Sequence, residues 1–476
     1  MHNTGRFTGL AISAAAAALL AAIPPSVTAG VTLTGSALYL GGTYHPLTVP
    51  EDTGQYIEGY VNWANYNYVT PSQLCPGCAS VAVYSPEQFW PGTGLRDLTY
   101  DASVAIGLDN LNNCLRGNPC TVTDPPYTSS VPRVLADSSY TVFGYSQSGA
   151  IASMQKSDLI AHPVSGTVSF VFEANPNRPH GGILERFVGV HIPILDVTFN
   201  GATVTNSLRS TPLTTVDVAH QYDPIADFPT NPLRLLADLN SLLGFAYEHP
   251  EGHSGAALLQ GQYQDSTYYL IPTATLPMLL PLTVVPFLGP LLATTLDPPL
   301  RVLVETAYDR TINPGAPTPA KFLYFPNPIQ TACDFLSAVP NGWDNGIAYL
   351  TSDPTNRPFH TTPAGPYGVG GPAVYTGAIE AYGPPTPLPD QVPAPGTADV
   401  ALPAAAESKD PVALTASPTE RETSPSAPGG RAPASPAHVL RPSSAPRRSP
   451  RASAARSASV PGPASAARAT TPSRAR

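Results

Sequence analysis

The sequence predicts an α/β protein in which a mainly parallel sheet is covered by helices on both faces. Three observations lead to this prediction. Apolar runs of strand length alternate with longer segments of helical periodicity, which is typical of βαβ units. Thr167–Phe172 is a nearly continuous run of β-branched and aromatic residues, as strands buried on both faces are. The apolar run Thr141–Phe143 leads into a glycine turn, and a helical segment follows that turn.

Five short apolar runs are the expected strands, and three longer periodic segments are the expected helices. The strands are Gly35–Leu40, Val81–Tyr84, Thr141–Phe143, Thr167–Phe172 and Thr214–Ala219. The helices are Leu95–Leu115, Ala150–Ile160 and Asn231–Tyr247. The glycines and threonine of Gly41–Thr43 predict a tight loop after the first strand.

Composition divides the 476 residues into three parts. In residues 1–29, basic residues precede an apolar stretch and small residues stand at Val27 and Ala29, which predicts a signal peptide cleaved after Ala29. Residues 30–380 have the mixed composition of one large folded domain. Residues 381–476 are rich in Pro, Ala, Ser and Arg, which predicts a disordered tail. We therefore expect a secreted or cell-envelope-associated protein.

Charge is distributed unevenly along the chain. The formal net charge is −9, yet Arg431–Arg476 holds nine arginines and no acidic residue, so the rest of the chain carries −18. An acidic body gives no reason to expect nucleic-acid binding. The basic tail is either a segment that associates with anionic envelope or membrane surfaces or an extension without function.

The five cysteines suit an oxidising compartment. Cys75 lies close to Cys78, and Cys114 lies close to Cys120, so four of the five could form two disulfides with Cys333 left over. Spacing alone does not give the connectivity. No second CxxC and no histidine cluster accompanies Cys75–Cys78, which favours a structural disulfide over a redox or zinc motif. HExxH, P-loop, EF-hand and dinucleotide-binding patterns are absent, so we expect no metal and no cofactor.

A candidate nucleophile lies between the third strand and the second helix. Gly144-Tyr-Ser-Gln-Ser148 has the strand–turn–helix context of a nucleophile elbow, with Ser148 where the usual pattern has glycine. We expect Ser146 to be the nucleophile. This context predicts an α/β-hydrolase-type fold, in which an acid and then a histidine follow the serine along the chain.

Two acids and two histidines fit that order. Asp223 and Asp227 follow the last predicted strand, at the sheet edge where Ser146 should lie; Asp223 is the first choice, and the acid not used in catalysis is expected to cap the following helix. His249 follows the Leu-rich helix, just before Pro250, and is preferred to His253 as the base. For the oxyanion hole we expect the backbone N–H of Gln147, with Gly42 and Thr43 on the loop after the first strand.

The segment 265–297 contains no charged residue between its two terminal aspartates and is strongly apolar from Leu276 to Leu292. Prolines at four- or five-residue spacing disfavour a membrane-spanning helix. Two interpretations remain equally open: a lid or acyl-binding wall, and ordinary core packing.

Four motifs give the chain a family resemblance. Phe143–Ser148, Asn177–Phe187, Gln221–Pro229 and Leu276–Pro281 together resemble the PE-PPE C-terminal domain of mycobacteria and their relatives, over roughly residues 35–310. That family is similar to cutinases, and the resemblance implies a serine esterase or lipase, or an acyltransferase that builds envelope glycolipids. Gly144–Gln147 also resembles the cutinase elbow, in which the Gln supplies an oxyanion donor. The predicted signal peptide stands where PE or PPE domains usually stand, which favours general secretion.

These features predict an exported serine hydrolase that cleaves carboxylic esters of lipophilic acyl groups through an acyl-serine intermediate. The substrate partner is then a lipid or another acyl ester. One alternative is an acyltransferase that moves acyl groups onto envelope glycolipids. A second is a non-catalytic envelope interaction protein that keeps the fold as a scaffold. The sequence does not indicate an oligomeric state.

Overall fold

The computed structural model describes residues 35–207, 213–250 and 255–372. The predicted signal peptide, the predicted tail and His253 lie outside the described residues. The described strands are β1 (Gly35–Tyr39), β2 (Ala79–Val83), β3 (Pro119–Thr123), β4 (Ser130–Val134), β5 (Ser139–Tyr145), β6 (Thr167–Glu173), β7 (His191–Ile192), β8 (Val197–Thr198), β9 (Thr215–His220), β10 (Leu258–Tyr263) and β11 (Ser266–Ile271). The helices are α1 (Gly54–Ala64), the π-helix η1 (Asn65–Val69), α2 (Thr70–Ser72), α3 (Tyr100–Leu115), α4 (Gln147–Ala161), α5 (Ile183–Arg186), α6 (Leu235–Tyr247), the 3₁₀ helix η3 (Pro277–Val284), α7 (Leu288–Glu305) and α8 (Pro328–Thr351).

Within these ranges, nine strands form one mixed sheet in the order β10-β11-β9-β6-β5-β1-β2-β3-β4, and β7 and β8 form a separate ribbon. The six strands from β11 to β2 are parallel to their neighbours. Antiparallel strands complete the sheet at both ends. The predicted α/β fold with a mainly parallel sheet is therefore confirmed. Since the parallel strands share one direction, their carboxyl ends meet at one edge, where α/β proteins place their sites.

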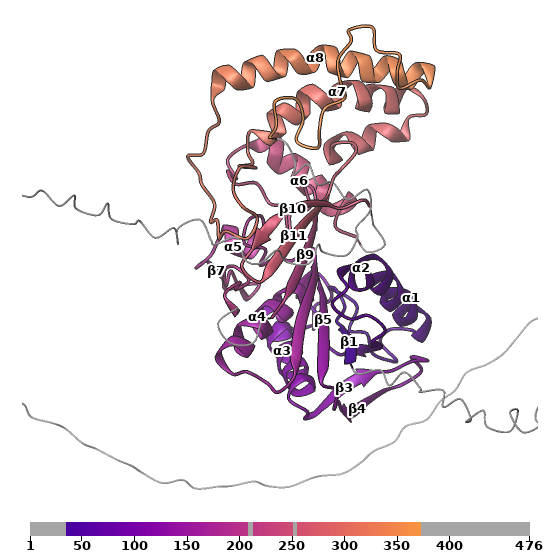
Figure 1. Cartoon of the computed structure of the whole chain (residues 1–476), viewed down its shortest axis with the longest axis vertical. Coiled ribbons are helices and arrows are strands. Elements are labelled where there is room, and N and C mark those ends of the chain that lie inside the picture. The colour runs from indigo at the N-terminus through magenta and orange to yellow at the C-terminus, as the bar shows by residue number, and fades with distance from the viewer. Residues whose placement is uncertain (1–34, 208–212, 251–254, 373–476) are drawn as a thin grey trace, which may run out of the picture. The chain divides into compact units, whose positions relative to one another are not determined.

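Side chains alternate between two cores on opposite faces of the sheet. From β1, Ala37 and Tyr39 join the core that includes residues of α1, whereas Leu38 joins the core that includes residues of α3 and α4. Figure 1 shows α1 and α2 on one side of the central strands and α3 and α4 on the other. This alternation follows from the two-residue side-chain period of a strand, and it explains why β1 is buried along its whole length.

Two predicted helices begin later than expected because of local turns. α3 begins at Tyr100 rather than Leu95, since glycines and a proline interrupt residues 91–94 and Leu95 is 82% exposed. α6 begins at Leu235 rather than Asn231, whose side chain accepts a hydrogen bond from the Leu233 N–H in a turn that competes with the helix. α4 begins earlier than predicted, at Gln147, directly after Ser146.

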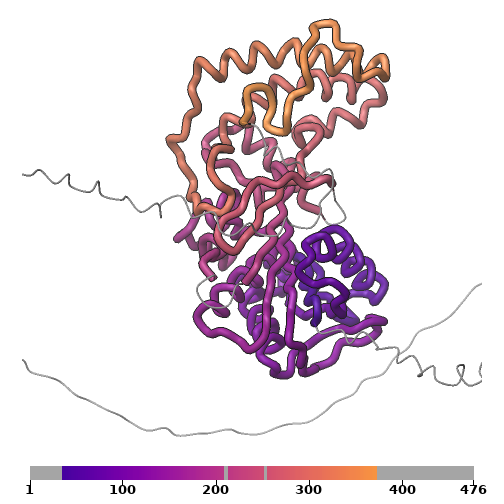
Figure 2. Tube along the Cα trace, viewed as in Figure 1, coloured from indigo at the N-terminus to yellow at the C-terminus, as the bar shows by residue number. Residues whose placement is uncertain are grey.

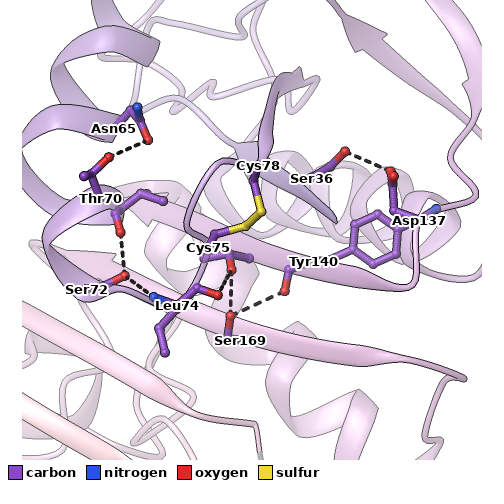
Figure 3. The surroundings of a disulfide bond; sticks show 12 residues. Ser36, Asn65, Thr70, Ser72, Leu74, Cys75, Cys78, Asp137, Tyr140 and Ser169 are labelled. Carbon is purple, nitrogen blue, oxygen red and sulfur yellow. Dashed lines mark hydrogen bonds between the residues drawn. A yellow bond between two sulfur atoms is a disulfide. The ribbon is translucent and has the colours of Figure 1, made fainter. Parts of the chain in front are cut away.

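The structure pairs Cys75 with Cys78 and Cys114 with Cys120, and it leaves Cys333 unpaired and exposed. Figure 3 shows the Cys75–Cys78 loop beside the sheet, where the Leu74 carbonyl accepts a hydrogen bond from the Thr141 hydroxyl. Thr141 belongs to β5, the strand that leads to Ser146. The first disulfide therefore closes a loop against the strand that carries the candidate nucleophile.

The apolar segment 276–292 forms η3 and the start of α7, two elements that pack against each other and against α6. Leu276 and Leu279 are buried, whereas Val284 and Phe287 are exposed, so the segment is core on one face and surface on the other. α7 continues to Glu305 and lies alongside α8 (Figure 2). No helix in the described ranges combines the length and the apolar character needed to cross a membrane.

Candidate active site

Ser146 lies on a sharp turn between β5 and α4, at the carboxyl edge of the sheet. Its backbone has φ 56° and ψ −119°, a strained conformation for a residue with a side chain, and α4 begins at the next residue. A Cβ on Gly144 would lie 2.8 Å from the Ser148 carbonyl oxygen and 3.1 Å from the Ala152 Cβ. Glycine is therefore required at 144, because the strand and the helix pass each other too closely for a larger residue.

Ser148 replaces the second glycine of the usual elbow pattern. Its hydroxyl accepts a hydrogen bond from the Tyr145 N–H at 2.9 Å and donates one to the Tyr145 carbonyl at 3.0 Å. Both backbone groups belong to the turn, and Ser148 is fully buried. The departure from the pattern thus supplies two hydrogen bonds that support the turn around Ser146.

The structure brings Ser146, His249 and Asp223 together in one hydrogen-bonded chain. Ser146 Oγ lies 2.8 Å from His249 Nε2, and His249 Nδ1 lies 3.0 Å from Asp223 Oδ1. All three residues are buried. A histidine that contacts a serine hydroxyl with one ring nitrogen and a carboxylate with the other can accept the hydroxyl proton while the carboxylate holds its orientation.

Backbone and ring contacts position His249. Its N–H donates to the Gly244 carbonyl, which ties it to the last turn of α6, and its carbonyl accepts a hydrogen bond from the Tyr145 hydroxyl at 2.5 Å. The imidazole stacks with Tyr145 and with Phe245 at ring-centroid distances of 5.5 Å and 5.2 Å. These aromatic contacts hold the ring in the plane that reaches both Ser146 and Asp223.

Asp227, the second-choice acid, is engaged elsewhere. It forms a buried ion pair with Arg310 at 2.6 Å and accepts a hydrogen bond from the Tyr222 N–H. The prediction that the second acid caps the following helix is wrong, because α6 begins at Leu235, eight residues later, and its preceding residue makes no side-chain cap. Through these two contacts, Asp227 instead stabilises the loop that carries Asp223.

The three residues expected at the oxyanion hole lie beside Ser146. A Cβ on Gly42 would meet the Tyr145 ring at 2.6 Å and would come within 3.7 Å of the Ser146 Cβ. Gln147 is the first residue of α4, so its N–H has no partner within the helix. The Thr43 hydroxyl donates to Gln147 Oε1 at 3.0 Å, and the Gln147 amide group donates to the Gln88 carbonyl and to Ser103 Oγ. The Gln147 side chain therefore fixes the loop against the helix terminus and leaves its backbone N–H for a developing oxyanion.

Two further acids, Glu248 and Glu173, flank the buried His220. Glu248 precedes His249 in the chain, and one of its carboxylate oxygens lies 4.0 Å from His220 Nδ1. His220 Nε2 in turn lies 3.9 Å from Glu173. Burial raises the pKa of Glu248 from 4.5 to about 7, with a hydrogen bond from Thr273 lowering it and the charge of Asp223 raising it. Below neutral pH, Glu248 is therefore protonated and adds no negative charge near Asp223.

The stability of the protein is expected to fall between pH 4.5 and pH 7 because of Glu248. Its pKa is raised on folding, so its contribution is fully present below the unfolded pKa and is lost as the pH rises through the folded one. The loss is on the order of 2–3 kcal/mol. Urea unfolding of wild type and Glu248→Gln at pH 5 and pH 8 should show the variant gaining relative to wild type at the higher pH. Exposed Glu58→Gln on α1 is the control, and an equal difference at both pH values would contradict the assignment.

One cluster in the described part of the chain could ligate a cation. Ligand atoms of Asp101, His191 and Asp196 lie within 4.8 Å of one another. Both carboxylates already accept hydrogen bonds, from Thr198 and from Thr99 respectively. Asp101 also lies in the first turn of α3, whose positive dipole end disfavours a cation. Ser146, His249 and Asp223 do not belong to this cluster, so it adds no metal to their chemistry.

Sequence reasoning did not identify the residues that hold His249 in place. Tyr145 is the variable residue of the elbow motif, and Phe245 is one of several apolar residues on α6, so neither has a local signal for this role. His253, the other histidine considered, lies outside the described residues. Only the folded arrangement shows that the two rings enclose the imidazole.

Comparisons with known proteins place the chain among PE-PPE domain proteins. Residues 76–309 match the family described as PE-PPE domain. The chain is 35% identical over 340 residues to the PPE family protein PPE42 of Mycobacterium tuberculosis, covering 68% of this chain and 53% of that protein. It is 37% identical over 319 residues to Esterase PE16 of the same organism, covering 63% of this chain and 54% of the relative.

A more distant relative carries a different activity in its name. SL1278 acyltransferase Chp1 of Mycobacterium tuberculosis is 27% identical over 343 residues, which cover 67% of this chain and 74% of that protein. The chain spans about half the length of PPE42 and PE16. The relatives thus include both an esterase and an acyltransferase.

Proposed function

We propose that this chain, which carries a PE-PPE domain over residues 76–309, is a serine hydrolase that cleaves carboxylic esters of lipophilic acyl groups. The observation that carries the proposal is the unbroken hydrogen-bonded chain from Ser146 through His249 to Asp223. The esterase named among the relatives supports the same reaction class. Labelling by a fluorophosphonate probe tests the proposal, because such probes react only with an activated serine.

The proposed reaction proceeds through two acyl transfers. Ser146 Oγ attacks the ester carbonyl carbon while His249 Nε2 takes the hydroxyl proton, and the N–H of Gln147 with the Gly42–Thr43 loop stabilises the oxyanion. His249 then returns the proton to the leaving alcohol, which gives the acyl-serine. Water attacks that ester by the same route, with His249 again as the base, and releases the carboxylic acid. Asp223 orients the imidazole in both steps and stabilises its charged form.

An apolar stripe on α6 supports a lipophilic acyl group. Leu235, Leu239, Leu242 and Phe245 are all exposed and lie on one face at helical spacing. Phe245 at the end of this stripe stacks on His249, so the stripe leads directly to the triad. Val284 and Phe287, at the end of η3 and just before α7, are further exposed apolar residues on elements that pack against α6. A hydrocarbon chain attached to the reacting carbonyl can bury its surface along these side chains.

Polar substitutions in the α6 stripe are expected to reduce the rate on long acyl chains selectively. Leu239→Ser with Leu242→Ser should lower kcat/KM for a p-nitrophenyl dodecanoate by roughly tenfold and should leave the butyrate within about twofold, because only the longer chain reaches the stripe. Leu95→Ser, at an exposed leucine before α3, is the matched control. An equal loss on both esters would mean that the stripe does not bind the acyl chain.

Acyl transfer to a sugar hydroxyl is the second candidate function. The acyltransferase among the relatives covers 67% of this chain, and the same triad would form the same acyl-serine. Incubation with an acyl ester, with and without a trehalose-like acceptor, separates the two functions. Free acid without acceptor supports hydrolysis, whereas product only with acceptor supports transfer. Absence of probe labelling would favour the scaffold interpretation instead.

We further propose that the protein acts outside the cytosol, at the cell envelope or beyond it. Support comes from the predicted signal peptide and from two disulfides, Cys75–Cys78 and Cys114–Cys120, which persist in oxidising compartments. Fractionation of cells that express the full chain tests this, and recovery in the cytosol would contradict it.

A further inference from the structure

α8 carries an apolar stripe that no element in the described ranges covers. Its exposed members are Ile329, Cys333, Leu336, Trp343 and Leu350, which we call the α8 stripe. Ile329, Leu336 and Trp343 are 76%, 68% and 56% exposed. Contiguous apolar surface of this kind is rare on monomeric soluble proteins and marks an interaction site.

The opposite face of α8 explains why the stripe points away from the protein. Gly342 and Gly346 face α7, where a Cβ on either would lie 2.1 Å or 2.3 Å from Thr295 atoms. These glycines let the two helices approach closely. The buried face of α8 that Ala338, Asn341 and Gly342 form lies roughly opposite the stripe around the helix axis. The pairing with α7 therefore fixes the orientation of α8 and presents the stripe outwards over a helix about 36 Å long.

The spacing of the stripe identifies the kind of partner. Its members follow one another at intervals of four, three, seven and seven residues. This spacing matches the seven-residue repeat of apolar residues through which two helices pair in a coiled coil. α8 contains no Lys or Arg, and its two acids are Asp334 and Asp344. A helix that lies on an anionic lipid surface carries basic residues along its polar face, so the composition favours a protein helix over a membrane.

Cys333 favours a second copy of the chain as the partner. It is the unpaired cysteine of a protein whose other four cysteines are joined in disulfides, and it lies within the stripe. When two identical helices pair in parallel around a two-fold axis, each position of the repeat faces its own counterpart. Cys333 would then face Cys333 of the second copy, and no like-charged pair would be brought together along the stripe.

We propose that the protein forms a two-fold dimer through parallel pairing of the α8 stripes, with the two Cys333 side chains in contact. This proposal is independent of the proposed ester hydrolysis, since α8 packs on α7 and contributes no residue to the triad. The active sites of the two copies stay separate. The dimer buries the apolar surface that the monomer leaves exposed.

Size-exclusion chromatography with light scattering, followed by oxidation, tests the dimer. Purified wild type should have twice the monomer mass at micromolar concentration. Oxidised glutathione should then convert it to a covalent dimer on a non-reducing gel, taking up the two electrons and two protons released by the two thiols. Cys333→Ser should remain a non-covalent dimer and lose only the covalent band.

Leu336→Glu should be monomeric and should form less than a tenth of the covalent dimer under the same oxidation. Leu95→Glu, at an exposed leucine outside the stripe, should behave as wild type. Far-UV circular dichroism of Leu336→Glu, expected to match that of wild type, checks that the variant is folded. A monomeric wild type, cross-linking of Leu336→Glu at the wild-type rate, or α8-dependent binding of monomers to neutral phosphatidylcholine vesicles would each overturn the proposal.

Discussion

Replacing Ser146 by alanine is expected to abolish fluorophosphonate labelling and to lower kcat for ester hydrolysis by roughly 10⁴–10⁶-fold. The reason is that Ser146 Oγ is the atom that lies 2.8 Å from His249 Nε2, in a turn whose backbone is held in a strained conformation. Removing the hydroxyl leaves the oxyanion donors and the substrate surface intact, so some rate above background should remain. Substrate binding, followed as KM, should change little.

The matched control for this substitution is Ser157→Ala, an exposed serine on the same helix. It should label and hydrolyse as wild type does. Thermal unfolding of Ser146→Ala should occur close to the wild-type temperature, because alanine keeps the Cβ and the backbone conformation and lacks only the hydroxyl. Labelling of Ser146→Ala at the wild-type level would show that another residue reacts and would reject the proposed nucleophile.

Replacing each acid of the 223–227 loop by its amide is expected to separate catalysis from stability. Asp223→Asn should reduce kcat by about 10⁴-fold with little change in the unfolding free energy, because an amide no longer fixes the His249 tautomer that accepts the serine proton. Asp227→Asn should reduce the unfolding free energy by about 3 kcal/mol, because it breaks a buried pair and leaves Arg310 with Glu305 as its remaining acidic partner.

Steady-state hydrolysis of a p-nitrophenyl ester and urea unfolding, both at pH 7, measure the two effects on the same preparations. At a temperature where both variants are folded, Asp227→Asn should retain activity within about tenfold of wild type, since the loop that carries Asp223 loses only one of its supports. The reverse pattern, with Asp227→Asn inactive and Asp223→Asn active, would exchange the roles of the two acids.

The alternation of apolar runs with helical segments predicts the fold, and the residues around Ser146 predict the position of the turn. Buried strands produce uninterrupted apolar runs, and an elbow requires small residues next to the serine, so both features are visible over a few residues. The predicted start of α3 lies five residues too early, because the leucines in the turn before Tyr100 continue the apolar spacing of the helix. The sequence does not predict α8, because Pro328, Pro340 and its glycines are residues that usually interrupt helices. In the structure, Gly342 and Gly346 pack against α7.

Chain order narrowed the triad partners of Ser146 to two acids and two histidines, because the direction of parallel strands brings residues after β9 to the same sheet edge. The choice of Asp223 over Asp227 depends on Arg310, which lies 83 residues after Asp227 in the chain and forms an ion pair with it. The rings that hold His249 and the partners of the cysteines likewise come together only on folding. Local periodicity therefore determined the fold, and the elbow motif determined the candidate nucleophile. Only the tertiary structure decided which distant side chains join the hydrogen-bonded chain of Ser146, because those contacts depend on packing that no short stretch of sequence encodes.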